Sequence, residues 1–200
     1  MNFHKRVHSL HFFPHQLVTI LFLVSLAALA CTARLPAETG TPGIFNFGKV
    51  NDHYYRGSQP NAEQVNELKQ FGIKTVIDLR KEFEEREEQW VQRQGMQYFL
   101  VPLTTQTPAT AEQTALFLKL ANDPGNWPVY VHCKGGRHRT GEMTAIYRIS
   151  NDKWTADQAY EEMKKYDFES GLFGGPDALK KYVYRFYEAS RKVSAADNYK

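Results

Sequence analysis

The sequence is poor in cysteine: Cys31 and Cys133 are the only two among 200 residues, and Cys31 lies near the N-terminus. A framework of several disulfides is therefore excluded. Charge of one sign is also lacking, because 25 basic side chains are balanced by 22 acidic ones and the formal net charge is only +3. This balance gives no ground for nucleic-acid binding. The absence of an internal repeat argues against a solenoid, and the 14% aromatic content indicates a packed globular domain.

Charged side chains are absent from residues 7–33, directly after two basic residues. Within this stretch Leu17–Ala30 is almost wholly apolar and ends in the sequence Ala-Leu-Ala. A positive start, an apolar segment and an A-x-A-like end are typical of an export signal. We therefore interpret residues 1–36 as a signal peptide or membrane anchor and residues 37–43 as a linker.

Three forms of the N-terminal segment are open. It is a cleaved signal, an uncleaved anchor whose uncharged stretch could nearly span a bilayer, or a lipoprotein site at Cys31. Each predicts an exported protein, periplasmic or secreted, that meets a membrane only through this segment. If Cys31 is cleaved off or lipidated, Cys133 becomes a lone thiol, which indicates reactivity.

Apolar runs and turn signals predict strands that alternate with helices. The predicted strands are Ile44–Val50, His53–Arg56, Ile73–Leu79, Met96–Val101 and Pro128–Val131. Helices are predicted at 61–71, at 81–94 with a charged, solvated face, and from Thr110, Thr140, Thr155 and Pro176. This order predicts an α/β fold with a mainly parallel central sheet of four to five strands and helices on both faces. The domain is expected to span residues 44–190, with a frayed tail at 191–200.

Residues 132–141, His-Cys-Lys-Gly-Gly-Arg-His-Arg-Thr-Gly, follow the last predicted strand and lead into a helix. Parallel sheets carry their sites at the carboxyl ends of the strands, where Cys133 falls. The two glycines can turn backbone N–H groups inward, and the helix start adds a partial positive charge. Arg139 offers a planar fork that fits two phosphate oxygens. Because the same positive field should lower the pKa of Cys133, the pattern predicts a nucleophilic thiolate in a phosphate-binding loop.

The His-Cys-x5-Arg-Thr pattern of this loop resembles the active-site loop of cysteine-based protein tyrosine and dual-specificity phosphatases. Tyr55–Pro60 and Val76–Arg80 are similar to the matching segments of compact atypical dual-specificity phosphatases from bacteria, fungi and plants. The resemblance extends from about Tyr54 to Met163. It implies a protein tyrosine phosphatase-like fold and a hydrolase that needs no metal or other cofactor.

The matching positions imply individual roles. Cys133 would be the nucleophile and form a phosphocysteine intermediate that water hydrolyses. Arg139 would hold the phosphoryl oxygens, and Thr140 would hydrogen-bond the sulfur and help it leave. His132 would order the loop and stabilise the thiolate without touching substrate. The residues expected to bind substrate are Lys134, Gly135, Gly136, Arg137 and His138.

The general acid departs from the family pattern. Family members usually carry an aspartate on a loop before the cysteine, whereas residues 103–109 contain no carboxylate. Glu112 is the nearest candidate, although its place in the first turn of a capped helix also suits a dipole role. Asp52, Asp78 and His138 are weaker candidates. Losing a general acid typically costs on the order of 10²–10⁴ in rate, and the loss shrinks when the leaving group is already acidic.

The expected substrate is a phosphorylated protein, with phosphotyrosine as the default, or a small phosphorylated molecule. Lys134 and Arg137 add cations to the loop if they face the substrate rather than solvent. Such basic loops resemble those of phosphoinositide and inositol pyrophosphate phosphatases, which are the alternative. The missing aspartate motivates a non-enzyme alternative, a phosphate-binding pseudophosphatase.

Two further hypotheses account for the loop less well. A metal site from His132, Cys133 and His138 is disfavoured because adjacent His and Cys side chains rarely both ligate one ion. A rhodanese-like sulfur transferase also uses a cysteine loop, but it gives no reason for Arg139 and Thr140 at the helix start.

Overall fold

The structure is a computed structural model that describes residues 40–82, 84–170 and 175–197. The predicted signal or anchor at residues 1–36 lies outside this range, and so do residues 37–39 of the predicted linker. Export and the three forms of the N-terminal segment therefore stay predictions. Within the described ranges, no helix is both long and apolar enough to cross a bilayer.

A five-stranded sheet forms the centre of the domain, with the strand order β1-β2-β5-β3-β4. The antiparallel edge pair is β1 (Gly48–Asn51) and β2 (Tyr54–Ser58). The remaining strands are parallel to one another: β5 (Val129–Cys133) lies between β2 and β3 (Thr75–Arg80), and β4 (Gln97–Leu103) follows β3. The prediction of a mainly parallel sheet is confirmed.

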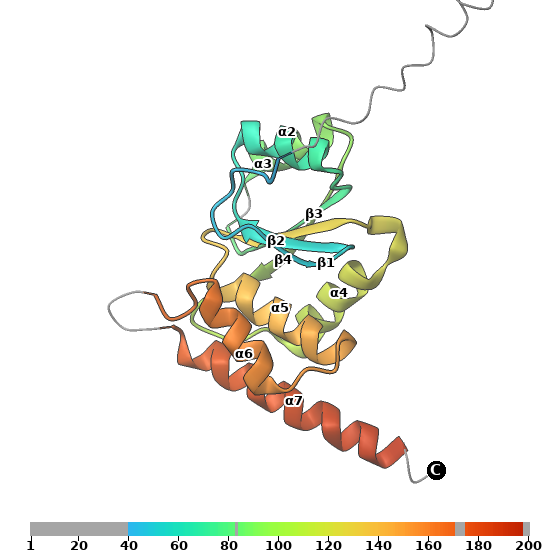
Figure 1. The fold of residues 1–200 in the computed structure, drawn as a ribbon, viewed down its shortest axis with the longest axis vertical. Helices are drawn as coiled ribbons and strands as arrows, with labels where there is room; N and C mark the ends of the chain where they lie inside the picture. Colours follow the sequence, from blue (N-terminus) through green and yellow to red (C-terminus); the bar gives the residue numbers. More distant parts are fainter. Residues whose placement is uncertain (1–39, 83, 171–174, 198–200) are drawn as a thin grey trace, which may run out of the picture. The chain divides into compact units, whose positions relative to one another are not determined.

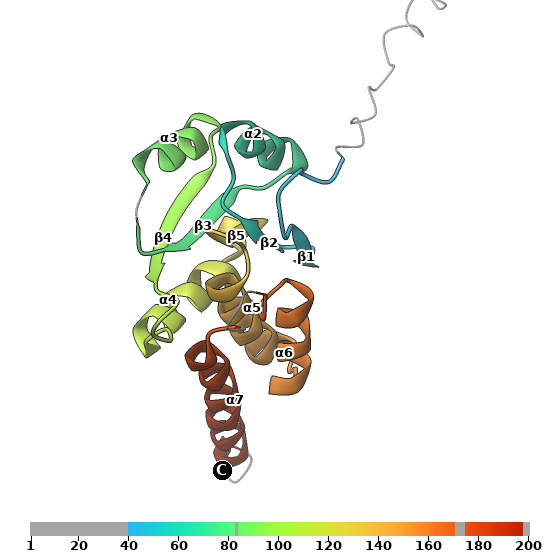
Figure 2. The same cartoon turned by 90° about the vertical axis from the view of Figure 1, so that its left-hand side faces the viewer.

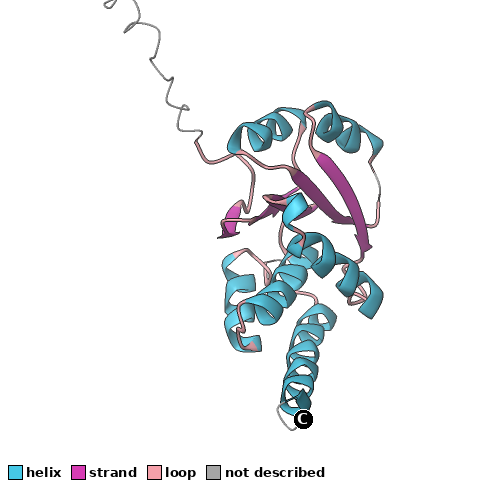
Figure 3. Cartoon of the chain, turned by 90° about the vertical axis from the view of Figure 1, so that its right-hand side faces the viewer, coloured by secondary structure: helices cyan, strands magenta, loops and turns pink. Residues whose placement is uncertain are grey.

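Helices cover both faces of this sheet (Figures 1 and 2). One face carries α2 (Ala62–Phe71) and α3 (Glu85–Arg93). The other face carries α4 (Ala111–Asn122) and α5 (His138–Asn151). Against α5 pack α6 (Ala156–Lys165) and α7 (Asp177–Asp197), which lie farther from the sheet (Figure 3). The predicted α/β fold with helices on both faces is confirmed.

The start of each of three helices follows from a capping box. The side chains of Asn61, Thr110 and Thr155 each accept a hydrogen bond from the backbone N–H three residues on. The residue at that position is a glutamine, whose side chain in turn accepts a hydrogen bond from the backbone N–H of the capping residue. This satisfies two backbone N–H groups that the helix cannot satisfy itself. The helix starts predicted at Thr110 and Thr155 are therefore confirmed.

The side chains of β5 alternate between two cores. Val129, Val131 and Cys133 belong to the core beneath α4 and α5. Tyr130 belongs to the core beneath α2 and α3, and the His132 ring stacks on it with a centroid separation of 5.7 Å. Because successive residues of a strand face opposite sides, adjacent His132 and Cys133 act in different environments.

Several element boundaries differ from the predictions. The strand predicted at Ile44–Val50 begins at Gly48, because Asn46 has a φ of 55° and a strand cannot continue through a left-handed residue. Asn46 instead reaches the loop after β5, donating a hydrogen bond of 3.0 Å to the Gly135 carbonyl. Helix α5 begins at His138 rather than Thr140, and α7 runs to Asp197, past the predicted end of the domain.

Candidate active site

The loop after β5 turns sharply against the neighbouring strand β2. Gly136 has a φ of 66°, and a Cβ atom added there would lie 2.5 Å from the Gly57 carbonyl carbon. A side chain at this position would therefore clash with backbone as well as force a strained conformation. Gly136 is required by the close approach of two chain segments.

The Cys133 thiol lies in the floor of this loop and is only 3% exposed. Burial alone would raise its pKa. The hydroxyl and N–H of Thr140, the charge of Arg139 and the N–H of Gly135 outweigh burial, so the pKa of Cys133 falls below its ordinary value. The direction agrees with the sequence prediction, since a lowered pKa increases the fraction of thiolate relative to a free cysteine.

Above the thiol opens a cavity of about 270 Å³. Its lining combines the cysteine with backbone and cations of the loop, and one residue comes from the segment after β4. The lining residues are Thr105, Cys133, Lys134, Gly135, Arg137, His138 and Arg139. Six of the predicted site residues are thus brought together around one space, whose size suits a phosphoryl group and part of its ester.

The cations around the cavity differ in how they are held. Arg139 is 9% exposed, and its Nη1 atom lies 3.4 Å from the Leu103 carbonyl and 3.7 Å from the Glu82 carboxylate. Arg137 lies 5.4 Å from the Phe45 ring centroid, so it is packed at the rim and does not extend freely into solvent. Lys134 is exposed.

His138 does not strengthen the positive charge of the loop. Burial first, and then the charges of Arg137 and Arg139, lower its pKa below the ordinary value, although a contact with the Phe168 backbone opposes them. The imidazole is therefore neutral at pH 7. Burial and the two neighbouring arginines thus disfavour a further positive charge at His138.

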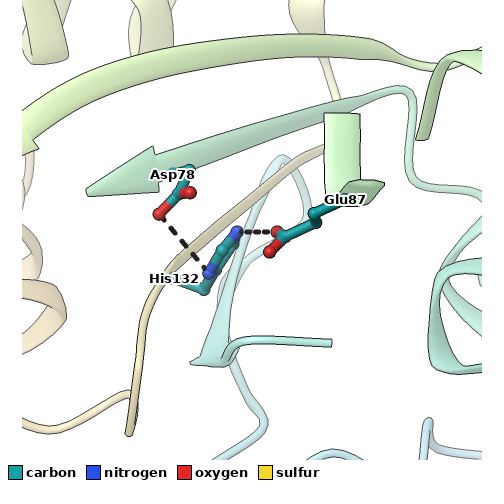
Figure 4. A group of neighbouring side chains, drawn as sticks. All are labelled: Asp78, Glu87 and His132. Atoms are coloured by element: carbon teal, nitrogen blue, oxygen red, sulfur yellow. Dashed lines mark ion pairs between the residues drawn. The ribbon is translucent and has the colours of Figure 1, made fainter. Parts of the chain in front are cut away.

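His132 faces the opposite side of the sheet and enters a cluster of buried charges (Figure 4). Its Nε2 atom lies 2.8 Å from the Glu87 carboxylate and its Nδ1 atom 3.8 Å from Asp78. Arg80 donates to both acids at 2.6 Å, and Tyr98 donates to Asp78 at 2.7 Å. The cluster ties β3, α3 and the strand that ends at the nucleophile together.

Glu87 corrects the prediction that the charged segment 81–94 is only a solvated face. Its neighbours Glu85 and Arg86 are exposed, but Glu87 is fully buried between Arg80 and His132. A buried carboxylate needs a charged partner, and the sequence separates Glu87 from His132 by more than forty residues. No local pattern could have identified it.

The cluster also affects the protonation of His132. Burial would lower the pKa of the imidazole, but Glu87 and Asp78 outweigh it and raise the pKa above its ordinary value. Asp78, Glu87 and His132 have the ligand types and spacing of a metal site. The guanidinium of Arg80 already bridges the two carboxylates, so a cation is in place without a metal.

The segment between β4 and α4 approaches the cavity but brings no carboxylate into its lining. Thr105 lines the cavity, whereas Glu112 is exposed on the first turn of α4. The helix-start backbone N–H and Thr110 lower the pKa of Glu112, which is the opposite of what a proton donor near neutral pH requires. Asp78 is paired with Arg80 and does not line the cavity. Neither Glu112 nor Asp78 is therefore placed to donate a proton to the leaving group.

Glu142 is a buried acid that the sequence did not reveal. It is 0% exposed on α5, and its Oε1 atom accepts the Ala109 N–H at 3.1 Å. Its Oε2 atom has no partner among the described residues. Burial raises the pKa of Glu142 to about 8, so at pH 7 it is protonated. Glu142 holds the end of the loop whose start contacts Arg139, but it does not line the cavity.

The comparisons with known proteins agree with this geometry. A family model described as "DSP-PTPase phosphatase fused to NAD+ Kinase" matches residues 45–179. The chain is 30% identical over 173 residues to the dual specificity protein phosphatase TpbA of Pseudomonas aeruginosa, covering 86% of this chain and 72% of TpbA. The chain therefore belongs to the dual-specificity (DSP-PTPase) phosphatase family.

Other relatives extend the comparison. The inositol diphosphatase DSP3 of Arabidopsis thaliana is 27% identical over 125 residues, covering 60% of this chain and 61% of DSP3. The core catalytic domain of the PP-IP phosphatase SIW14 from S. cerevisiae has a TM-score of 0.65 at 20% identity and covers 78% of this chain and 93% of its own. A cysteine-to-serine variant of P. aeruginosa TpbA, solved in complex with pTyr, has a TM-score of 0.57 at 25% identity and covers 72% of this chain and 90% of its own. The fold is that of the protein tyrosine phosphatases.

Proposed function

We propose that the chain hydrolyses phosphate monoesters through a phosphocysteine intermediate and that its preferred substrate is phosphotyrosine on a protein. The observation that carries the proposal is the Cys133 thiol, whose pKa is lowered at the floor of a cavity lined by Arg139. A thiolate beneath a guanidinium fork is placed for in-line attack on phosphorus.

The reaction has two displacement steps. In the first, the Cys133 sulfur forms a bond to phosphorus, the bond to the ester oxygen breaks, and that oxygen takes up a proton. In the second, water attacks the phosphocysteine, the sulfur leaves as thiolate, and inorganic phosphate carries the water oxygen away. Arg139 balances charge on the phosphoryl oxygens in both steps, and the hydroxyl of Thr140 stabilises the departing sulfur.

The leaving group sets the preference for tyrosine. None of the residues that line the cavity is a carboxylic acid, so solvent must protonate the ester oxygen. A phenol leaves with little help, whereas a serine alkoxide needs a donor, whose absence typically costs on the order of 10²–10⁴ in rate. The complex of a TpbA variant with pTyr supports the same ligand class.

The first experiment measures turnover of p-nitrophenyl phosphate by the wild type and by Cys133→Ser. We expect turnover by the wild type only, because the nitrophenolate needs no acid and serine cannot supply a thiolate. Equal rates for the two proteins would refute the proposal that the chain is an enzyme and would favour a phosphate-binding pseudophosphatase. Phosphate released from a phosphotyrosyl and a phosphoseryl peptide is then compared, and a preference for serine would contradict the leaving-group argument.

A second candidate substrate is an inositol pyrophosphate or a phosphoinositide. Arg137 lines the cavity beside Arg139, and Lys134 lies exposed at its rim, so a substrate with several phosphates would meet three cations. In an inositol pyrophosphate the leaving group is itself an acidic phosphate, whereas a phosphoinositide releases an alkoxide, and DSP3 is named an inositol diphosphatase. A double variant, Lys134→Gln with Arg137→Gln, distinguishes the candidates: it should weaken cleavage of the polyphosphate far more than that of the tyrosyl peptide.

A further inference from the structure

Arg56 on β2 lies directly beneath the phosphate-binding loop and is completely buried. Its Nη2 atom donates a hydrogen bond of 2.7 Å to the Gly136 carbonyl. The guanidinium carbon lies 3.9 Å from the centroid of the Tyr166 ring. Among the described residues, the Nε and Nη1 atoms of Arg56 have no hydrogen-bond partner.

The charge of Arg56 has no carboxylate in direct contact among the described residues, and Glu162 acts on it only at longer range. No ion pair joins it to an acid in the part of the chain that the structure describes, whereas buried Arg80 contacts both Asp78 and Glu87 at 2.6 Å. A buried cation without a counter-ion is costly to fold, and guanidinium does not lose its proton in proteins. The fold therefore keeps a permanent positive charge at this position.

The position of that charge relates it to the nucleophile. In the parallel pair of β2 and β5, Ser58 lies opposite Cys133, and Arg56 lies opposite Val131. Arg56 reaches the loop at Gly136, three residues after the cysteine. The anions that form in this region are the Cys133 thiolate and the phosphoryl group in the cavity above it.

The hydrogen bond also orients the loop. Because the Gly136 carbonyl is directed at Arg56, its partial negative charge is turned away from the cavity. The N–H groups of a tight loop can converge on an anion only if the carbonyls point outward. Arg56 thus acts on both the charge and the geometry of the cradle.

We propose that Arg56 is a positioning residue of the active site, which fixes the Gly136 peptide and supplies a second, buried positive charge for the thiolate and the bound phosphate. This inference rests on the proposed function of Cys133 and Arg139 but concerns anion binding, which can be measured without turnover. Arg56 does not line the cavity and is not proposed to touch substrate.

The test compares Arg56→Met, Arg56→Gln and Arg56→Lys by the pH dependence of Cys133 alkylation with iodoacetamide. We expect the methionine and glutamine variants to raise the alkylation midpoint by about one pH unit, the low end of the shift that a nearby opposite charge produces. Vanadate, a phosphate mimic, protects the thiol from alkylation, and in these two variants the concentration needed for protection should rise about tenfold. Arg56→Lys keeps the charge and should recover at least half of the midpoint shift.

The control is Arg93→Met, since Arg93 is exposed on α3, where it donates a hydrogen bond to Gln89 of the same helix. It should leave the midpoint and the vanadate protection unchanged. If Arg56→Gln is folded by circular dichroism but has the wild-type midpoint and vanadate protection, Arg56 is merely structural and the proposal is wrong. A wild type that binds vanadate but turns over no substrate would instead refute the proposed function and leave this inference standing.

Discussion

Two fully buried glutamates, Glu142 and Glu87, should respond in opposite directions to the same substitution. Glu87 contacts the cations Arg80 and His132. Glu142 has only the Ala109 N–H and lies against no cation within ion-pair distance among the described residues. Replacing each by glutamine removes the ionisable group at nearly constant volume. We expect Glu142→Gln to stabilise the fold at neutral pH and Glu87→Gln to destabilise it.

The magnitude for Glu142 follows from its pKa. Burial raises that pKa from 4.5 to about 8, so between these values the folded chain binds a proton that the unfolded chain has released. Stability therefore falls as pH rises through this window and is constant outside it. At about 1.36 kcal/mol per pKa unit, the wild type loses roughly 3 kcal/mol by pH 7 and roughly 5 kcal/mol above pH 8. Glu142→Gln has no proton to lose and should escape this loss.

For Glu87 the sign reverses. Breaking a buried ion pair by removing one partner costs about 3–5 kcal/mol. The amide can still accept hydrogen bonds, so we expect about 3 kcal/mol, or a fall in melting temperature of about 6–12 °C for a domain of this size. Glu87 contributes most to raising the pKa of His132, so the pKa should fall when Glu87 is replaced, which the NMR titration of the imidazole would show.

The assay is urea unfolding at pH 5, 7 and 8.5, with exposed Glu85→Gln on the same helix as Glu87 as the control. The stability difference between Glu142→Gln and the wild type should grow between the first two pH values and level off near the third. Parallel pH curves for the two proteins would show that Glu142 is not a buried neutral acid. If Glu87→Gln lowers the free energy of unfolding by less than about 1 kcal/mol, the contacts of Glu87 are no stronger than a surface salt bridge and the reasoning is wrong.

Three further substitutions test the site. Gly136→Ala should abolish most p-nitrophenyl phosphate turnover and lower stability by about 1–3 kcal/mol, because the left-handed backbone and the contact with β2 both resist a Cβ atom; calorimetry and kcat/KM report the two effects. Glu82→Gln should tighten inhibition by inorganic phosphate by less than about fivefold, since an exposed carboxylate near Arg139 competes weakly with the ligand. Glu112→Ala should leave the shape of the pH–rate profile unchanged, and loss of one limb of that profile would identify Glu112 as the acid.

The sequence was a good guide wherever the signal is local. The capping boxes at Thr110 and Thr155 predicted helix starts, and the valine-rich strand before Cys133 predicted the floor of the loop. It was a poor guide where a residue's role depends on a distant partner. Glu87 could not be told from the exposed acids beside it, and nothing near Glu142 in the chain indicates that Ala109 would meet it.

The two charged environments at the end of β5 arise from one strand. His132 and Cys133 are adjacent, but the pleat sends the imidazole into a closed cluster of two acids and two cations and the thiol into an open cradle of cations. The two acids of the cluster are paired with Arg80 and His132, so its contribution to the thiolate is mainly to hold the strand end in place. The cradle differs: among the described residues neither Arg139 nor Arg56 forms an ion pair with a buried carboxylate, so the anions that balance it are the Cys133 thiolate and the bound phosphoryl group. Phosphate binding should therefore stabilise the domain more than a surface salt bridge could, and the stabilisation should decrease when Arg56 is replaced by methionine.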